Sequence, residues 1–519
     1  MAMALWLLIL IPILSAPFAW MGQQWSRSAP RWITLGTLAV DGLLALLLGS
    51  RDHAAQVSDH GSWFIESHIS WIPRWGISLH LGLDGLSLIL IVLTAVIGVI
   101  ATIASWTEIH SRVGLFHCNV LLALGGVIGV FLAIDLFLFF CFWELMLVPM
   151  YLLIVIWGHA QRRHASFKFF LFTQAGSLVL LVAIVTLAFL HQQATGQLSF
   201  DYADLMELTL SSQMARWLMV AFLMGFLVKL PAPPFHTWLP DTYVEAPTGA
   251  TIILAGILAK TGAYGLLRFT IPLFPEAMSE LSPIAMGLGV VGILYAALLA
   301  CAQTDIKRLV AYSSISHMGF ILLGAFAGTE LALQGVVMQM VAHGLSTGGL
   351  FLLAGALEER YQTREMSHMG GLWSVMPRLA TMALFFACAS LGLPGLANFI
   401  GEFLILFGSY ATQPFMVILA SLGMVMAAIY SLGMMQRTFF GRQQDTRPVP
   451  DLSNVAFGTV LVIAVLQIWL GLYPKAILTT TKPVMEQLVQ AAVESANPIH
   501  SRSESLLSSQ IVASQGTTP

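Results

Sequence analysis

The sequence predicts an all-α polytopic membrane protein with about 14 transmembrane helices. Its residues are 57% hydrophobic and only 9% charged, whereas a soluble domain is about 25% charged. The apolar residues occur in long runs, and a helix needs about 20 of them to span a bilayer. These runs are too long for barrel strands and show no alternation of polar and apolar residues.

The apolar runs place the spans in order along the chain. They fall near residues 4–20, 33–50, 84–105, 114–133, 136–157, 169–190, 217–230, 247–267, 283–303, 309–327, 332–356, 379–410, 415–435 and 455–474. Residues 1–20 lack the basic start of a signal peptide, so we expect a retained first helix. The connection 51–83 holds several tryptophans, which are typical of an interfacial segment, and 191–216 is a second long connection.

Lysine and arginine residues give the orientation. With the N-terminus outside, fourteen of them fall in the inner loops and seven on the outer side, as the positive-inside rule requires. The other two lie within spans. The C-terminus is then also outside, and we expect the polar tail to hold a short amphipathic helix at 484–495. After Pro498 the tail is Ser-rich, which is typical of disorder.

Four ionisable residues lie inside the apolar spans: Glu144, Lys229, Lys260 and Glu402. A charge at bilayer depth costs roughly 3 kcal/mol on insertion scales, so such residues usually face a protein interior or a wet path. Because intramembrane charges mark ion or proton routes, the sequence predicts a proton or cation conductor.

Two spans are interrupted in a way that indicates a transport site. The seventh ends in Lys229-Leu-Pro-Ala-Pro-Pro, and the twelfth is cut by Pro394-Gly395, so neither continues as one regular helix. If spans 4–8 and 9–13 are two five-helix repeats, the breaks correspond, and the odd number of helices makes the repeats inverted. Sequence similarity between the two blocks is weak, and the alternative is that each proline only kinks a packed helix.

Composition excludes several other classes of function. A net charge of -3, without a Lys/Arg-rich block, excludes a nucleic-acid partner. The cysteines, Cys118, Cys141, Cys301 and Cys388, lie singly in apolar spans without a metal-ligand spacing. We therefore expect free thiols, with no disulfide, iron–sulfur cluster or structural zinc site. We predict no catalytic, cofactor-binding or metal-binding residue in this chain.

A set of motifs runs through these spans. They are Gly126-Val-Ile-Gly-Val-Phe-Leu-Ala-Ile-Asp, Phe142-Trp-Glu-Leu-Met-Leu-Val-Pro-Met-Tyr, Val228-Lys-Leu-Pro, Trp238-Leu-Pro-Asp, Ala246-Pro-Thr, Leu258-Ala-Lys-Thr-Gly-Ala-Tyr-Gly, Thr304-Asp-Ile-Lys-Arg-Leu-Val-Ala-Tyr-Ser-Ser-Ile-Ser-His-Met-Gly, Ala342-His-Gly and Asn398-Phe-Ile-Gly-Glu-Phe. With them the chain resembles, from about residue 80 to 475, the antiporter-like membrane subunits of proton-pumping NADH-quinone oxidoreductase (respiratory complex I). Glu402, where sister subunits tend to carry lysine, indicates one branch of that family.

The resemblance implies a division of the chain and a set of partners. The parts are 1–110, N-terminal helices 1–3 with an outer loop; 111–270, a first antiporter-like repeat; 271–436, a second inverted repeat; 437–475, helix 14; and 476–519, a polar tail. The expected partners are the other membrane subunits of complex I, including sister antiporter-like subunits, within a bacterial inner membrane. NADH, FMN, iron–sulfur clusters and quinone are expected in partner subunits.

The same resemblance gives roles to the ionisable residues. Glu144 would pair with Lys229 as a switch, because a nearby carboxylate favours the charged form of a buried amine and its withdrawal favours the neutral form. The alternative is a static ion pair, which would stabilise little. Lys260 would be the central relay and Glu402 the exit group, with His343 bridging them through water.

Other residues are open to two interpretations. His317 is a further relay candidate, or a packing histidine. Asp135 is expected to be an interfacial or helix-start residue, and His236 could be simple packing. The family loop before Ala246-Pro-Thr usually holds a histidine, but here Thr242, Tyr243 and Glu245 occupy it, which puts a histidine role there in doubt.

Three functions remain from the sequence. The first is a proton-translocating subunit driven by redox chemistry in partner subunits. The second is a subunit of a multisubunit cation/proton antiporter or of a membrane-bound hydrogenase. The third is a structural spacer whose charges only hold helices together.

Overall fold

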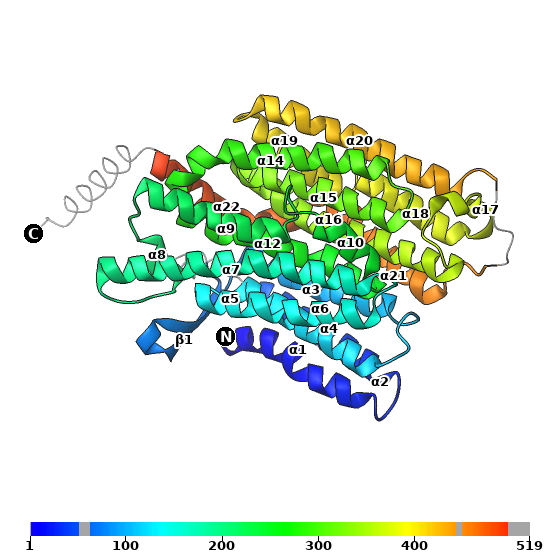
Figure 1. Cartoon of the computed structure of the whole chain (residues 1–519), viewed down its shortest axis with the longest axis horizontal. Helices are drawn as coiled ribbons and strands as arrows, with labels where there is room; N and C mark the ends of the chain where they lie inside the picture. The colour runs from blue at the N-terminus through cyan, green and yellow to red at the C-terminus, as the bar shows by residue number, and fades with distance from the viewer. Residues whose placement is uncertain (1, 51–62, 443–448, 497–519) are drawn as a thin grey trace, which may run out of the picture.

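A computed structural model describes residues 2–50, 63–442 and 449–496. These residues form a bundle of long helices that lie side by side (Figure 1). The end of the chain after Pro498, where we expect disorder, lies outside the described residues, as does the first part of the connection 51–83.

Eleven helical segments within the described residues are long and apolar enough to cross a membrane. They are α1 (Ala2–Gly22), α2 (Ala29–Gly49), α3 (Gly85–Ala104), α4 (Val113–Leu132), α5 with α6 (Leu136–Leu145 and Leu147–Trp157), α7 (Arg162–Thr195), α11 to α13 (Thr248–Leu273), α14 (Pro275–Cys301), α16 (Glu330–Tyr361), α20 (Pro414–Phe439) and α21 (Asn454–Leu472). The chain is therefore confirmed as an all-helical membrane protein in its main body.

The remaining helices complete the bundle. They are α8 (Tyr202–Met206), α9 (Ser212–Lys229), α10 (Trp238–Glu245), α15 (Ile306–Ala325), α17 (Leu372–Val375), α18 (Pro377–Ser390), α19 (Ala397–Tyr410) and α22 (Lys475–Ala496). Helix α9 begins earlier than the predicted 217 because the Ser211 hydroxyl caps it by accepting from the Met214 amide. The predicted span 379–410 is two helices, α18 and α19.

One end of the bundle carries a β-hairpin, and we call it the hairpin end (Figure 1). Strands β1 (Ile65–Ile72) and β2 (Ile77–Leu83) pair antiparallel there. The hairpin was not predicted. Its apolar residues alternate along β2, and the Ile134 amide donates to the His80 carbonyl, which fixes it to the α4–α5 connection.

Helix α22 lies against the bundle from the hairpin end. It starts at Lys475 and is longer than the amphipathic helix predicted at 484–495. Met485 and Thr481 are buried, because α22 packs on α3, α14 and α16. The contact with α3 is so close that a side chain at Gly85 would collide with the Thr480 carbonyl.

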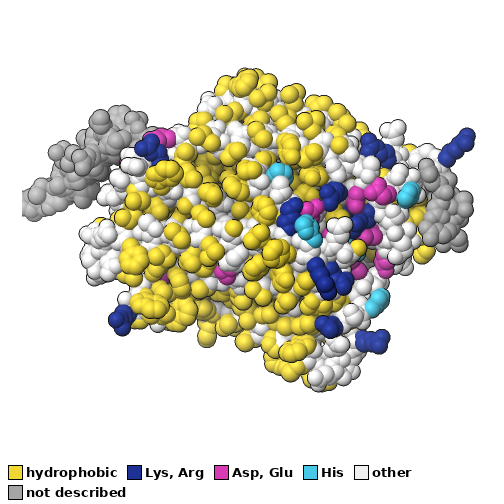
Figure 2. Space-filling view, viewed as in Figure 1, with side chains coloured by type: hydrophobic (Ala, Val, Ile, Leu, Met, Phe, Trp, Pro, Cys, Tyr) yellow, Lys and Arg dark blue, Asp and Glu magenta, His cyan; other side chains and the backbone are white. Residues whose placement is uncertain are grey.

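The opposite end, which we call the Glu358 end, gathers charged side chains. Figure 2 shows apolar side chains over the middle of the bundle and a group of basic, acidic and histidine side chains at this end. Glu358 forms an ion pair with Lys307, with Oε2 and Nζ 2.5 Å apart. Asp241 on α10 pairs with Lys168 on α7 at 2.7 Å and with Arg308 on α15 at 2.8 Å. These ion pairs tie three helices together at the bundle end.

Candidate functional site

Lys260 lies at the centre of the bundle, fully buried on α12 (Ala259–Gly265). This helix is flanked by two π-helical turns, η2 (Leu254–Leu258) and η3 (Leu266–Thr270). Such turns are frequent at functional sites because they release backbone groups from regular pairing. The Lys260 Nζ atom donates to the Ala255 carbonyl in the first of these turns, so the local backbone supplies one hydrogen-bond partner for the amine.

The second partner of Lys260 is His343 on α16. The Lys260 Nζ and His343 Nδ1 atoms are 2.7 Å apart, which is hydrogen-bond distance. The other ring nitrogen, His343 Nε2, is buried with no hydrogen-bond partner among the described residues. An imidazole with one bonded and one free nitrogen can take a proton on one side and release it on the other.

His317 on α15 continues the line toward Glu402. Its ring centroid is 5.6 Å from that of His343, and its Nδ1 is 2.6 Å from Glu402 Oε1. All three side chains are buried. The structure therefore brings Lys260, His343, His317 and Glu402 into one sequence of neighbours, with His317 between His343 and the carboxylate.

The break between α18 and α19 shapes the Glu402 end of this line. Gly392 and Gly395 have φ of 77° and 95°, a left-handed conformation that favours glycine. A Cβ at Gly392 would lie 3.4 Å from Glu402 Oε2, so the broken segment passes directly beside the carboxylate. Ser390, the last residue of α18, lies 3.2 Å from His317 Nε2.

Besides Ser390, two polar residues of this cluster were not predicted from the sequence. Gln339 donates to Glu402 Oε1 at 2.9 Å, and Tyr430 lies 3.3 Å from His317 Nε2. Gln339 precedes His343 by one helical turn, so the i, i+4 spacing on α16 could have indicated it. No comparable sequence signal marks Tyr430, because its position depends on how α20 packs.

Glu144 and Lys229 form a separate region. Lys229 is buried at the end of α9, with Nζ 5.1 Å from the Trp143 ring centroid and 6.0 Å from that of Phe169, close enough for cation–π attraction. Glu144 on α5 is half-buried. The two side chains interact electrostatically, but no ion pair within 4.0 Å joins them in the described structure.

The backbone after Lys229 is broken as the prolines predict. The Trp238 indole donates to the Val228 carbonyl at 2.9 Å, which satisfies a carbonyl that the interrupted helix leaves free. Helices α9 and α12 are in close contact, since a Cβ at Gly262 would lie 2.8 Å from the Leu230 nitrogen. The Lys229 and Lys260 regions are thus adjacent along packed backbones.

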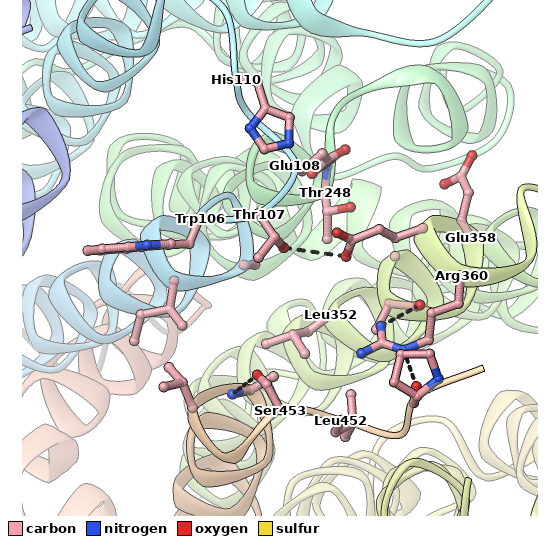
Figure 3. Close-up of a pocket in the computed structure, with 18 of the residues that line it drawn as sticks. Trp106, Thr107, Glu108, His110, Thr248, Leu352, Glu358, Arg360, Leu452 and Ser453 are labelled. Atoms are coloured by element: carbon pink, nitrogen blue, oxygen red, sulfur yellow. Dashed lines mark hydrogen bonds between the residues drawn. The ribbon is translucent and has the colours of Figure 1, made fainter. Parts of the chain in front are cut away.

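A cavity of about 1250 Å³ opens at the Glu358 end (Figure 3). Glu108, His159 and Glu358 line it, and the Glu108 carboxylate accepts from the Thr248 amide at 3.0 Å. Burial raises the pKa of Glu108, although Lys307 and the Thr248 hydrogen bonds oppose the shift. Burial and the nearby Lys307 lower the pKa of His159. The cavity therefore presents proton-exchanging groups at the end of the bundle.

Two helices connect this cavity with the Lys260 pair. Thr248 and Gly355 touch at the cavity wall, and Lys260 and His343 each lie twelve residues farther along the same helical segments. At 1.5 Å per residue, the Lys260–His343 pair is therefore about 18 Å from the Thr248–Gly355 contact along the helices. Between them Ile252 lies next to Gly348 of α16, since a Cβ at Gly348 would be 3.8 Å from the Ile252 side chain. Water therefore has to pass this apolar side chain for protons to reach Lys260.

The other predicted residues occupy structural positions. Asp135 caps α5 by accepting from Phe137 and Leu138 amides, which confirms it as a helix-start residue. The His236 ring packs edge to face against Tyr295. Glu245 accepts from the Gln161 amide at 2.7 Å and closes the α6–α7 turn.

The residues of the unusual loop and the cysteines are also placed. Tyr243 is buried, with its hydroxyl unpartnered among the described residues, and Thr242 donates to the Trp238 carbonyl at 2.7 Å. All four cysteines are free, as expected, and half-buried.

Comparison with known proteins gives a consistent picture. Residues 133–428 match the family described as "NADH:quinone oxidoreductase/Mrp antiporter, TM". The chain is 50% identical over 492 residues to NADH-quinone oxidoreductase subunit M of Pseudomonas aeruginosa, covering 93% of this chain and 97% of that protein.

Two solved structures have similar folds. A chain of respiratory complex I from Thermus thermophilus with bound NADH matches with a TM-score of 0.85 and 32% identity, covering 94% of this chain and 99% of that one. A chain of the Mrp complex from Dietzia sp. DQ12-45-1b matches with a TM-score of 0.81 and covers 95% and 99% of the two chains. At 19% identity, this second match shows the shared fold alone.

Proposed function

Because the chain belongs to the subunit M family of NADH-quinone oxidoreductase, within the wider NADH:quinone oxidoreductase/Mrp antiporter family, we infer that it is the proton-pumping membrane subunit of such a complex. It acts as a subunit of an enzyme, respiratory complex I. We propose that NADH, FMN, iron–sulfur clusters and quinone are bound by partner subunits, and that sister antiporter-like subunits adjoin this chain.

The proposed proton path rests on one observation. Four buried ionisable side chains lie next to one another in the order Lys260, His343, His317 and Glu402. Lys260 passes a proton to His343, which is 2.7 Å away. The free His343 Nε2 passes it through one water to His317, since the ring centroids are 5.6 Å apart. Glu402 then receives the proton from His317 and releases it toward the hairpin end through the broken α18–α19 region.

We propose that Glu144 and Lys229 act as a switch that controls this line. When the Glu144 carboxylate approaches, the charged form of Lys229 is favoured, and when it withdraws, desolvation favours the neutral form. Moving one proton against 100 mV costs about 2.3 kcal/mol, which a change of this kind between buried groups can supply. The separated arrangement of the two side chains supports a pair that opens and closes.

We also propose a finer topology of fourteen spans with two inverted repeats, helices 4–8 and 9–13. The corresponding breaks after Lys229 and after Ser390 support it. The hairpin end would face the outer side of a bacterial inner membrane, with both termini there. Lysine and arginine residues near the starts of helices at the Glu358 end support this orientation.

Glu402→Gln is the direct test of the proposed exit group. Glutamine keeps the size of the side chain but cannot carry the proton, so we expect NADH-driven acidification of inverted vesicles to fall more than about tenfold, a barrier rise of at least ~1.4 kcal/mol. Glu280→Gln is the matched control, because Glu280 pairs with Arg216 at the exposed surface. Unchanged pumping in Glu402→Gln, with the control also unchanged, would remove Glu402 from the path.

The orientation has its own test. We expect Ser70→Cys, exposed on β1, to react with an impermeant maleimide in intact spheroplasts. Ser26→Cys, in the α1–α2 connection at the opposite end, is expected to react only after the membrane is opened. The reverse pattern would invert the proposed topology.

A second candidate is a subunit of a cation/proton antiporter or membrane-bound hydrogenase, and the description of the matching family names the Mrp antiporter beside the oxidoreductase. Gentle detergent extraction distinguishes these functions. NADH dehydrogenase activity that co-purifies with the chain supports the complex I subunit. Sodium/proton exchange in vesicles without NADH oxidation would support the antiporter instead.

A further inference from the structure

A cluster of two histidines and two carboxylates lies at the hairpin end, apart from the proton line. His68 on β1 and His80 on β2 are direct cross-strand partners, so both side chains project from one face of the hairpin. Their rings meet edge to face with centroids 4.9 Å apart. Asp201, at the start of α8, completes a triad whose ligand atoms all lie within 4.8 Å of one another.

The two nitrogens of His80 have different partners. Nδ1 contacts the carboxylate of Asp201, the third member of the triad. Nε2 lies 2.5 Å from Glu66 Oε1. A metal-bound histidine almost always gives its second nitrogen to a carboxylate or carbonyl, which fixes the orientation of the ring. Glu66 binds the second nitrogen, Nε2, in this way. Nδ1 is then the nitrogen that would bind a metal ion beside Asp201.

We propose that His68, His80 and Asp201 bind a first-row transition metal ion, with Zn²⁺ the best fit, and that Glu66 orients His80. Two imidazoles and one carboxylate are a zinc ligand set, and water can take a fourth position. Ca²⁺ and Mg²⁺ fit poorly because they prefer oxygen ligands. Zinc bonds of about 2.0–2.2 Å hold tetrahedral ligand atoms roughly 3.3–3.6 Å apart, so a bound ion would separate the His80 Nδ1 and Asp201 Oδ2 atoms that now touch. His68 is exposed at the hairpin surface, so its side chain can turn toward the ion.

The scaffold around the triad is fixed by backbone hydrogen bonds. Asp201 caps α8 with its other oxygen, which accepts from the Ala203 amide at 3.0 Å. The Leu136 amide donates to the Phe200 carbonyl at 2.9 Å, which joins this segment to the start of α5. A bound metal would therefore link the hairpin, the α8 segment and the helix that carries Glu144.

Zinc titration of the purified complex tests the site. After chelator treatment and gel filtration, we expect the wild-type complex to rebind one zinc equivalent more than His68→Gln, measured by elemental mass spectrometry. His164→Gln, which changes an exposed histidine on α7, should keep that equivalent. Glu66→Gln is expected to weaken zinc binding about 10–100-fold, as is typical when the orienting partner of a ligand is lost.

A rescue variant separates metal binding from a folding effect. His68→Cys replaces one zinc ligand by another, so it should restore the equivalent that His68→Gln loses. Equal zinc content in wild type and His68→Gln would overturn the proposal and leave a hydrogen-bonded cluster only. Loss of zinc in both His68 variants would overturn it as well, because a true ligand position tolerates the thiolate. This inference does not depend on the proton path.

Discussion

Replacing Lys260 by methionine is expected to abolish NADH-driven proton pumping while the complex still assembles. Lys260 is fully buried, and methionine has a similar length and no charge, so the bundle should accept it. The change removes the group that donates to Ala255 and lies 2.7 Å from His343. Because no other amine adjoins His343 among the described contacts, we expect pumping to fall more than about tenfold.

The measurement is the ratio of protons moved to NADH oxidised in inverted vesicles. Lys482→Met is the control, since Lys482 is half-exposed on α22 and pairs only with Glu486 in the described structure. A surface ion pair of this kind contributes about 0–1 kcal/mol, so the control should pump normally. An unchanged proton ratio in Lys260→Met would exclude Lys260 from the path.

The positions of the relay residues could be predicted because an ionisable side chain is costly in an apolar run. Lys260 and Glu402 stand out on that ground alone, and both are buried in the bundle. The family resemblance added His343. The sequence did not indicate that His317, rather than water alone, would stand between His343 and Glu402, because that contact depends on how α15 packs against α19.

The structural features that could not be predicted from the sequence depend on contacts between segments that are far apart in the chain. The Glu144–Lys229 pair was expected from resemblance, but helix packing sets their separation, and sequence spacing does not report it. The hairpin was hidden because its alternating residues are few and adjoin a long apolar run. His68 and Asp201 of the triad lie 133 positions apart in the sequence, so no local ligand spacing could reveal the site.

Glu144→Gln is expected to reduce pumping as strongly as the loss of Lys260, for a different reason. Glutamine keeps the shape of the half-buried side chain and removes the negative charge that acts on Lys229. Without that charge, no carboxylate returns to favour the charged form of Lys229, and the proposed switch stays in one position. We therefore expect both pumping and quinone-coupled NADH oxidation to fall, whereas loss of an exit group alone should affect pumping first.

Glu144 distinguishes a switch from a spacer because its substitution by glutamine changes the charge and keeps the size of the side chain. Glu144 Oε1 has no hydrogen-bond partner among the described residues, so Glu144→Gln breaks no hydrogen bond at that atom. Glu207→Gln, on the exposed surface at the hairpin end, controls for general loss of charge. A spacer predicts normal pumping in both variants, and that result would refute the switch. Loss of pumping in Glu144→Gln alone, with the complex intact on native gels, requires the charge itself to take part in turnover.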